Sequence, residues 1–126
     1  MKRRTEGIIR LTPAADYSAK EGYGVTIAGD VATLSASATV PWDGVIAEGG
    51  TVAQGCGVVV LGAVPGGMDV KLSGTVARGA KLIQAADGTA VTDSGTGARV
   101  QLGVVNEAGV SGDLVEFFPR TPLILS

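Results

Sequence analysis

The residues that could do chemistry in this chain are carboxylates gathered in its last third: Asp87, Asp93, Glu107, Asp113 and Glu116. Two carboxylates facing each other across a cleft could act as the acid and base of a glycosidase. However, each of the three aspartates stands beside a glycine or a Ser-Gly pair, where aspartate is favoured because its side chain bonds to the backbone of a turn. The sequence therefore favours turn formation over acid–base catalysis at these positions.

Nucleophilic catalysis and metal binding have little support. The chain contains no histidine, the commonest general base at neutral pH and the commonest zinc ligand. Cys56 is the one cysteine, and its glycine and valine neighbours favour a small buried residue over a nucleophile. The segment GTGARV from Gly95 lacks the Lys-Ser/Thr of a phosphate-binding loop, and no D-x-D-x-D-G calcium spacing occurs. We therefore expect a protein that is not an enzyme and has no cofactor and no metal site.

Composition indicates one compact β domain. The 126 residues include 20 glycines, and 45% of them are hydrophobic but only 4% aromatic, which suits closely packed sheets of small aliphatic side chains. No run approaches the ~20 apolar residues of a membrane-spanning helix. We expect a soluble protein, made in a cytoplasm, that has no membrane partner.

Charge is distributed unevenly. Lys2, Arg3 and Arg4 supply three of the ten basic residues, which leaves seven against twelve acidic ones in the rest of the chain. A body of that sign would repel nucleic acid, whose binding depends on lysine and arginine neutralising phosphates. The basic start is interpreted either as a solvated terminus or as a contact with phosphate or an acidic protein surface.

Short apolar runs separated by glycine, proline and aspartate predict an all-β fold, a small β-barrel or β-sandwich of about eight short strands with tight glycine-rich turns. The segment GVTIAGDVATLS from Gly24 has the form of a hairpin that turns at Gly29-Asp30. Further strands are expected at 57–64, 68–72, 81–85, 90–92, 100–105 and 114–118. The domain organisation predicted is an extended N-terminal arm (1–20), a β domain (21–118) and an apolar C-terminal tail (119–126).

An internal echo accompanies this pattern. The segments VIAEGGTV (45–52) and TVARGAKL (75–82) align at a spacing of 30 residues, and VNEAGVSGDLV from Val105 is a looser third copy. In each, an apolar residue precedes a glycine-containing bend and an apolar run follows. We interpret the echo as a chain that turns a corner and re-enters a sheet.

Three segments are predicted to make contacts rather than catalyse. Trp42 occupies a turn, where its ring either caps the core or faces a partner. Pro119 and Pro122 are expected to stop strand pairing, so that the apolar tail packs back on its own sheet or crosses to a neighbouring subunit. The residues concerned in the tail are Leu123, Ile124 and Leu125.

The arm is the third contact segment. It is expected to be mobile in the free protein and to add as a strand to a neighbouring sheet, because no hairpin partner for it is apparent. Its predicted contact residues are Lys2, Arg3, Arg4, Ile8, Ile9 and Leu11.

The last third, from Val70 to Phe118, resembles the small capsid decoration (cement) proteins of tailed bacteriophages. Many of these proteins end in a phrase like G-x-x-x-E-A-G-x-x-G-D-L-V-E. The matching residues are Gly103, Glu107, Ala108, Gly109, Gly112, Asp113, Leu114, Val115 and Glu116. The resemblance implies a non-enzymatic role on the outer surface of an expanded phage head, usually as trimers that bridge subunits of the major capsid protein. The long lead to about Glu21 and the TPLILS tail depart from the shortest examples.

The function expected is therefore that of a decoration protein on the exterior of a virion, synthesised in the host cytoplasm, with the major capsid protein as its partner and a homotrimer as its favoured assembly. The alternatives are another virion β module, such as a tail or fibre component, or a glycan-binding domain. The scarcity of aromatic residues counts against glycan binding.

Overall fold

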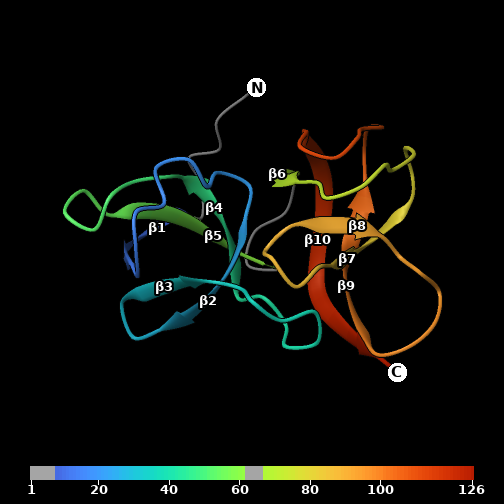
Figure 1. Cartoon of the computed structure of the whole chain (residues 1–126), viewed down its shortest axis with the longest axis horizontal. Coiled ribbons are helices and arrows are strands. Elements are labelled where there is room, and N and C mark those ends of the chain that lie inside the picture. The colour runs from blue at the N-terminus through green and yellow to red at the C-terminus, as the bar shows by residue number, and fades with distance from the viewer. Residues whose placement is uncertain (1–7, 62–66) are drawn as a thin grey trace.

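A computed structural model describes residues 8–61 and 67–126, which form strands and loops arranged as two five-stranded units (Figure 1). The first unit is a closed barrel in the order β1-β3-β2-β4-β5, and the second is a sheet in the order β6-β10-β9-β7-β8. The strands of the first unit are β1 (Ile8–Pro13), β2 (Gly24–Ala28), β3 (Val31–Leu34), β4 (Gly44–Glu48) and β5 (Cys56–Val60). Those of the second are β6 (Met68–Lys71), β7 (Lys81–Gln84), β8 (Ala90–Thr92), β9 (Arg99–Val105) and β10 (Leu114–Leu125). The prediction of a small all-β fold is confirmed, with ten described strands where about eight were expected.

The second unit repeats the topology of the first. In the first unit Ile9 pairs with Val58, and in the second Met68 pairs with Phe117, so both partners have advanced by 59 positions (9 to 68 and 58 to 117). The closing contact is repeated as well: the parallel pairing of Pro13 with Ala32 in the barrel corresponds to a single parallel bridge between Leu72 and Ala90. The chain is therefore a tandem of two equivalent β units, the first closed and the second nearly so.

Backbone hydrogen bonds outside the strand ladders recur in the same places. Equivalent pairs are Tyr17 N–H to Gly50 O (2.9 Å) and Val76 N–H to Gly109 O (2.9 Å); Ile46 N–H to Tyr23 O (3.0 Å) and Val105 N–H to Ala80 O (3.0 Å); and Ala14 N–H to Ala32 O (2.9 Å) and Ser73 N–H to Ala90 O (3.0 Å). Loops that lack regular structure are thus held by matching bonds in both units. The equivalence extends beyond the order of the strands to the connections between them.

The repeat predicted at a spacing of 30 residues is wrong. Residues 45–52 cover most of β4 and the loop after it, whereas residues 75–82 cover the loop before β7 and its first two residues. The looser copy from Val105 is the structural equivalent, because Ile46 and Val105 make corresponding hydrogen bonds. An apolar residue, a glycine bend and another apolar run occur at several strand junctions, so this pattern alone does not identify the repeating unit.

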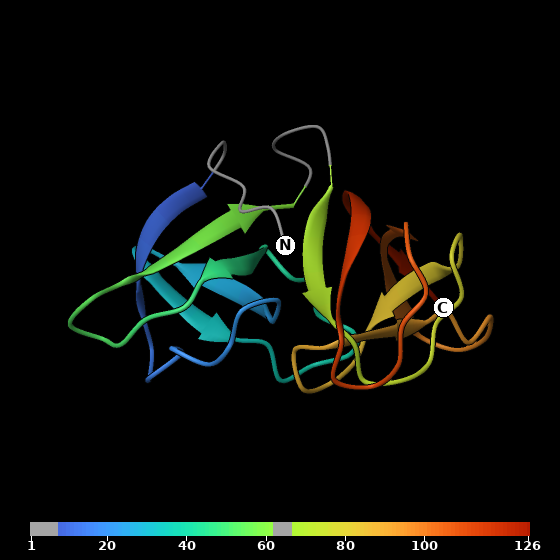
Figure 2. The same cartoon turned by 90° about the horizontal axis from the view of Figure 1, so that it is seen from above.

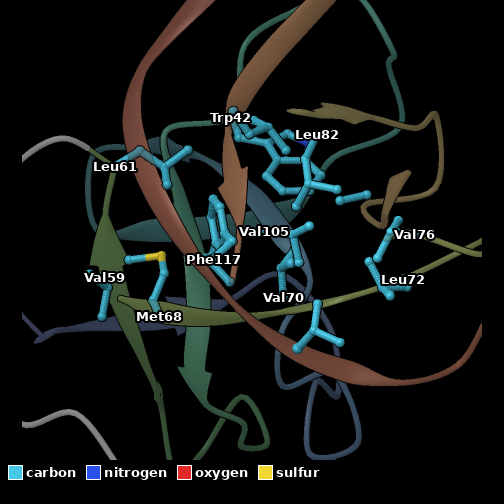
Figure 3. Close-up of a cluster of buried hydrophobic side chains, with 14 residues drawn as sticks. Trp42, Val59, Leu61, Met68, Val70, Leu72, Val76, Leu82, Val105 and Phe117 are labelled. Atoms are coloured by element: carbon cyan, nitrogen blue, oxygen red, sulfur yellow. The ribbon is translucent and has the colours of Figure 1, made fainter. Parts of the chain in front are cut away.

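The two units lie side by side (Figures 1 and 2), and one hydrophobic cluster contains residues of both. A small cluster that includes Val25, Ile46 and Val58 fills the barrel. A larger cluster fills the second unit and extends to the outer face of the barrel, where Val59 contributes (Figure 3). Val45 belongs to the same cluster. The units therefore pack as one body.

Polar contacts also cross between the units. The Gly24 N–H donates to the Gly88 carbonyl (2.8 Å), and the Lys71 N–H donates to the Gly22 carbonyl (2.9 Å). The buried Gln84 side chain donates from Nε2 to the carbonyls of Ser37 and Val40, at 2.8 and 2.6 Å, and accepts from the Trp42 N–H at 3.2 Å. A buried amide with three partners in the loop before β4 fixes that loop on the second unit.

The predicted N-terminal arm is wrong for the part of residues 1–20 that the structure describes. Ile8 to Leu11 form an antiparallel ladder with β5, and Thr12 and Pro13 pair in parallel with β3, so this strand closes the barrel. Ile8 pairs with Val59, which is too distant in the sequence to be its partner in a hairpin. Lys2, Arg3 and Arg4 lie outside the described residues.

The prediction that Pro119 and Pro122 end strand pairing is also wrong. β10 continues to Leu125, because the register against β9 shifts between Pro119 and Leu123, and pairing then resumes with Leu123 opposite Gln101. A bulge tolerates a residue without an N–H, since the ladder bond is already interrupted there. The tail therefore follows the first of its two alternatives, because its backbone pairs with β9 of its own sheet.

Candidate interaction surfaces

The aspartates of the last third support turns, as the sequence predicts. Asp87 accepts from the Thr89 N–H at 3.2 Å, and Asp113 Oδ2 accepts from the Val110 N–H at 2.9 Å. Each carboxylate bonds to a backbone amide two or three residues away in its own loop. This use of the carboxylates matches turn formation rather than a catalytic pair.

Asp93 anchors the glycine loop between β8 and β9. Its carboxylate accepts from the Gly95 N–H (2.9 Å), Arg99 Nε (2.5 Å) and Gln101 Nε2 (2.7 Å). Burial opposes ionisation of Asp93, but the hydrogen bonds from these three groups outweigh it and hold the pKa below its ordinary value. The GTGARV segment is therefore a loop tied to a structural carboxylate.

Cys56 is completely buried in the barrel, which confirms the interpretation of a small core residue. Burial raises the pKa of its thiol, although the charge of Arg10 acts in the opposite direction. Within residues 8–61 and 67–126, no group of three or more histidine, cysteine, aspartate or glutamate side chains is placed to hold a metal ion.

Two open surface hollows occupy equivalent places in the two units. One is lined by residues that include Thr12, Asp30 and Val52, and the other by residues that include Lys71 and Asp87. In the second hollow Lys71 Nζ donates to the Gly112 carbonyl at 3.1 Å, so its ammonium group is used within the fold. The two hollows correspond because the two units have the same topology.

An acidic surface covers the outer face of β6 and β10. Asp69 lies directly opposite Glu116 in the ladder, and Glu107 Oε1 accepts from the Glu116 N–H at 2.8 Å. Burial raises the pKa of Asp69, and the negative charges of Glu107 and Glu116 raise it further. Like charges opposite each other across a strand pair are destabilising, so this surface opposes folding at neutral pH.

On the corresponding surface of the barrel, a basic residue stands where the second unit has an acidic one. Arg10 occupies the position equivalent to Asp69 (10 to 69) and forms an ion pair with Glu48 (2.6 Å), which is equivalent to Glu107 (48 to 107). The pair is largely exposed, so its contribution to stability is small. The two equivalent faces have nevertheless diverged in charge.

We expect Asp69→Asn to raise the melting temperature at pH 7. Because the folded state favours neutral Asp69, the protein loses stability as the pH rises through the raised pKa, and asparagine removes that loss. The advantage of the variant should shrink as the pH falls toward 3.8, the ordinary value for aspartate. Thermal unfolding across this range measures the difference, and Asp30→Asn at an exposed position is the control. A pH-independent effect of Asp69→Asn would contradict the electrostatic explanation.

Trp42 is buried in the larger cluster, so the alternative in which it caps the core is the one the structure shows (Figure 3). Its ring lies against the backbone of Gly24, where a Cβ atom would overlap the indole. The alternative in which it faces a partner is therefore wrong. The sequence places a tryptophan in a turn but does not reveal that the turn folds under a second unit.

The predicted arm residues of the barrel divide between core and surface. Leu11 packs against the barrel core, and Ile8 packs against the larger cluster. Ile9 remains 40% exposed. Only Ile9 of these three is placed for contact with a partner.

The C-terminal strand exposes several apolar side chains. Leu123 is 45% and Ile124 64% exposed, while Leu125 is half-buried. Phe118, which was not among the predicted contact residues, is 48% exposed and lies opposite Val104. Successive side chains of a strand point to opposite faces, so the burial of Phe117 implies that Phe118 points outward. β10 therefore presents apolar groups on the surface both before and after its register shift.

None of the described residues forms a helix long and apolar enough to cross a membrane. No protein-family model matches the chain, and no curated protein has significant sequence similarity to it.

Proposed function

We propose that this protein is a head decoration protein of a tailed bacteriophage, which binds the exterior of the expanded capsid and bridges subunits of the major capsid protein without catalysis. The observation that carries the proposal is the exposure of Leu123 and Ile124 on β10, in an all-β body whose aspartates support turns. Apolar side chains on a fixed strand can contact a neighbouring protein with little loss of conformational entropy.

Several residues of the segment that resembles decoration proteins make contacts that stabilise the fold. Gly103 lies directly under the Phe118 carbonyl, and a Cβ atom at Gly109 would meet the Leu72 and Val115 side chains at 2.9 and 2.7 Å. Glu107 bonds to the backbone of β10 through Glu116. This segment therefore builds the connection between β9 and β10 and supports the strand that exposes the apolar groups.

The strength of attachment to the capsid would depend on the contact area. Each apolar contact contributes about 25 cal/mol per Å² buried, and a homotrimer that engages several capsid subunits multiplies weak contacts through avidity. The basic residues Lys2, Arg3 and Arg4 are proposed to contact acidic groups of the capsid. Such contacts would add a salt-dependent component to attachment.

Co-sedimentation with heads assembled from the major capsid protein of the same genome tests the proposal. We expect the protein to pellet with expanded heads and not with unexpanded ones. Ile124→Asp should weaken attachment at least tenfold, whereas Val52→Asp, at a similarly exposed position on the barrel, should bind normally. The proposal fails if the wild-type protein does not pellet with expanded heads, or if both variants bind as well as the wild type.

A further inference from the structure

The junction between the two units buries an outer sheet face. Ile46 and Val58 point into the barrel, so Val45 and Val59 on the same strands point outward. Val59 is nevertheless only 1% exposed, because the second unit covers it. Met68, at the start of β6, belongs to the same cluster as Val59 and is 7% exposed (Figure 3). The outer face of β4 and β5 is therefore held against the Met68 end of the next unit.

The tandem repeat places equivalents of both partners in β1 and in β9 and β10. Phe118 is equivalent to Val59 (59 to 118), and Val104 is equivalent to Val45 (45 to 104). Ile9 is equivalent to Met68. Phe118 and Ile9 are 48% and 40% exposed, although the residues they correspond to are buried in the junction. One half of a second junction thus lies at each end of the molecule.

We propose that copies of this chain associate head to tail, with the outer face of β9 and β10 of one copy packed against the Ile9 end of the barrel of the next copy. The interface between chains then repeats the junction within the chain: Phe118 takes the place of Val59, and the neighbour's Ile9 takes the place of Met68. This inference goes beyond the proposed function and holds whether or not the protein binds a capsid.

A second copy is the partner that fits both surfaces at once. The chain already contains one junction of this kind, and the repeat gives every molecule an equivalent of each side of it.

The contact is heterologous, since different surfaces meet, and it therefore propagates until it closes into a ring or extends as a filament. A trimer built in this way would be a ring of six equivalent β units. The trimer expected for this protein would then have a structural basis in the repeat itself.

Sedimentation velocity on single variants tests the interface. We expect the wild-type protein at tens of micromolar to form a closed assembly, and Phe118→Asp and Ile9→Asp each to be monomeric. Val110→Asp is the matched control, because Val110 is 54% exposed but is equivalent to Thr51, in a loop outside the junction (51 to 110). This control should assemble like the wild type.

Mixing the two monomeric variants separates a heterologous contact from other kinds. Each retains one intact surface, so an equimolar mixture of Phe118→Asp and Ile9→Asp should give a one-to-one heterodimer and nothing larger. Formation of the heterodimer also reports that both variants are folded. If circular dichroism shows that Ile9→Asp is unfolded, Ile9→Thr, which suits a strand, replaces it with an expected loss of affinity of at least tenfold.

The inference is overturned if the wild-type protein is a monomer, if folded Phe118→Asp still assembles, or if Val110→Asp disrupts assembly equally. It is also overturned if the two folded variants are monomeric and no heterodimer forms. A failure of capsid binding leaves it intact, whereas a monomeric protein that binds heads normally removes it and preserves the proposed function.

Discussion

Replacing Trp42 with alanine is expected to lower the free energy of unfolding by about 3–5 kcal/mol, the range for truncating a buried large aromatic side chain. The indole is the largest fully buried side chain of the described residues and lies where the two units meet. Its loss leaves a cavity between Gly24 and the second unit, which rigid sheets on both sides can close only in part. Denaturant unfolding followed by circular dichroism measures the change.

Trp42→Phe is the matched control. The indole Nε1 has no hydrogen-bond partner among the described residues, so phenylalanine removes no hydrogen bond and retains most of the ring volume. We expect it to lose less than half as much stability as alanine. Equal losses would indicate that an unseen polar contact, rather than packing, holds the junction.

Gly103→Ala is expected to destabilise the protein by more than about 3 kcal/mol, in the tail of the distribution for single substitutions. Gly103 has a φ of 157°, and a Cβ atom there would overlap the Phe118 carbonyl oxygen and approach Pro119 Cα to 3.0 Å. Both neighbours are backbone atoms of β10 and cannot move without breaking the ladder. The same unfolding measurement applies, and hydrogen exchange of the amides in the β9–β10 ladder should become faster.

Gly95→Ala separates conformational strain from the steric overlap. Gly95 has a φ of 80°, but nothing lies within 4 Å of a Cβ atom at that position. Alanine should therefore cost only about 1 kcal/mol there, the ordinary penalty for a left-handed residue. Similar losses at Gly95 and Gly103 would mean that the close approach of β10 does not constrain the fold.

The sequence predicts those elements whose partners are near in the chain. The hairpin of β2 and β3 follows from alternating apolar residues around Gly29-Asp30, and the turn roles of Asp87 and Asp113 follow from adjacent glycines. β1 is different, because Ile8 finds its partner at Val59. Apolar residues without a nearby partner look the same in sequence whether they form a free arm or close a barrel.

The tandem repeat escapes sequence reasoning for a related reason. Equivalent positions share glycines where the backbone requires them, as at Gly44 and Gly103, which both lie under a carbonyl of the neighbouring strand. Surface positions have diverged as far as Arg10 and Asp69. Backbone geometry constrains only a few residues in each unit. The repeat is therefore recognised from the strand pairing and not from the sequence.

Each unit is completed by its last strand, because β5 pairs with β1 and β10 pairs with β6. During synthesis the barrel can close as soon as Val60 has left the ribosome, whereas the second unit must wait for β10. Val45 and Val59 then face water while the remaining residues are made, which takes several seconds at about 5–20 residues per second. A nascent barrel therefore passes through a period in which its apolar outer face is open to other nascent chains, and the rate of translation through the second unit sets how long that period lasts.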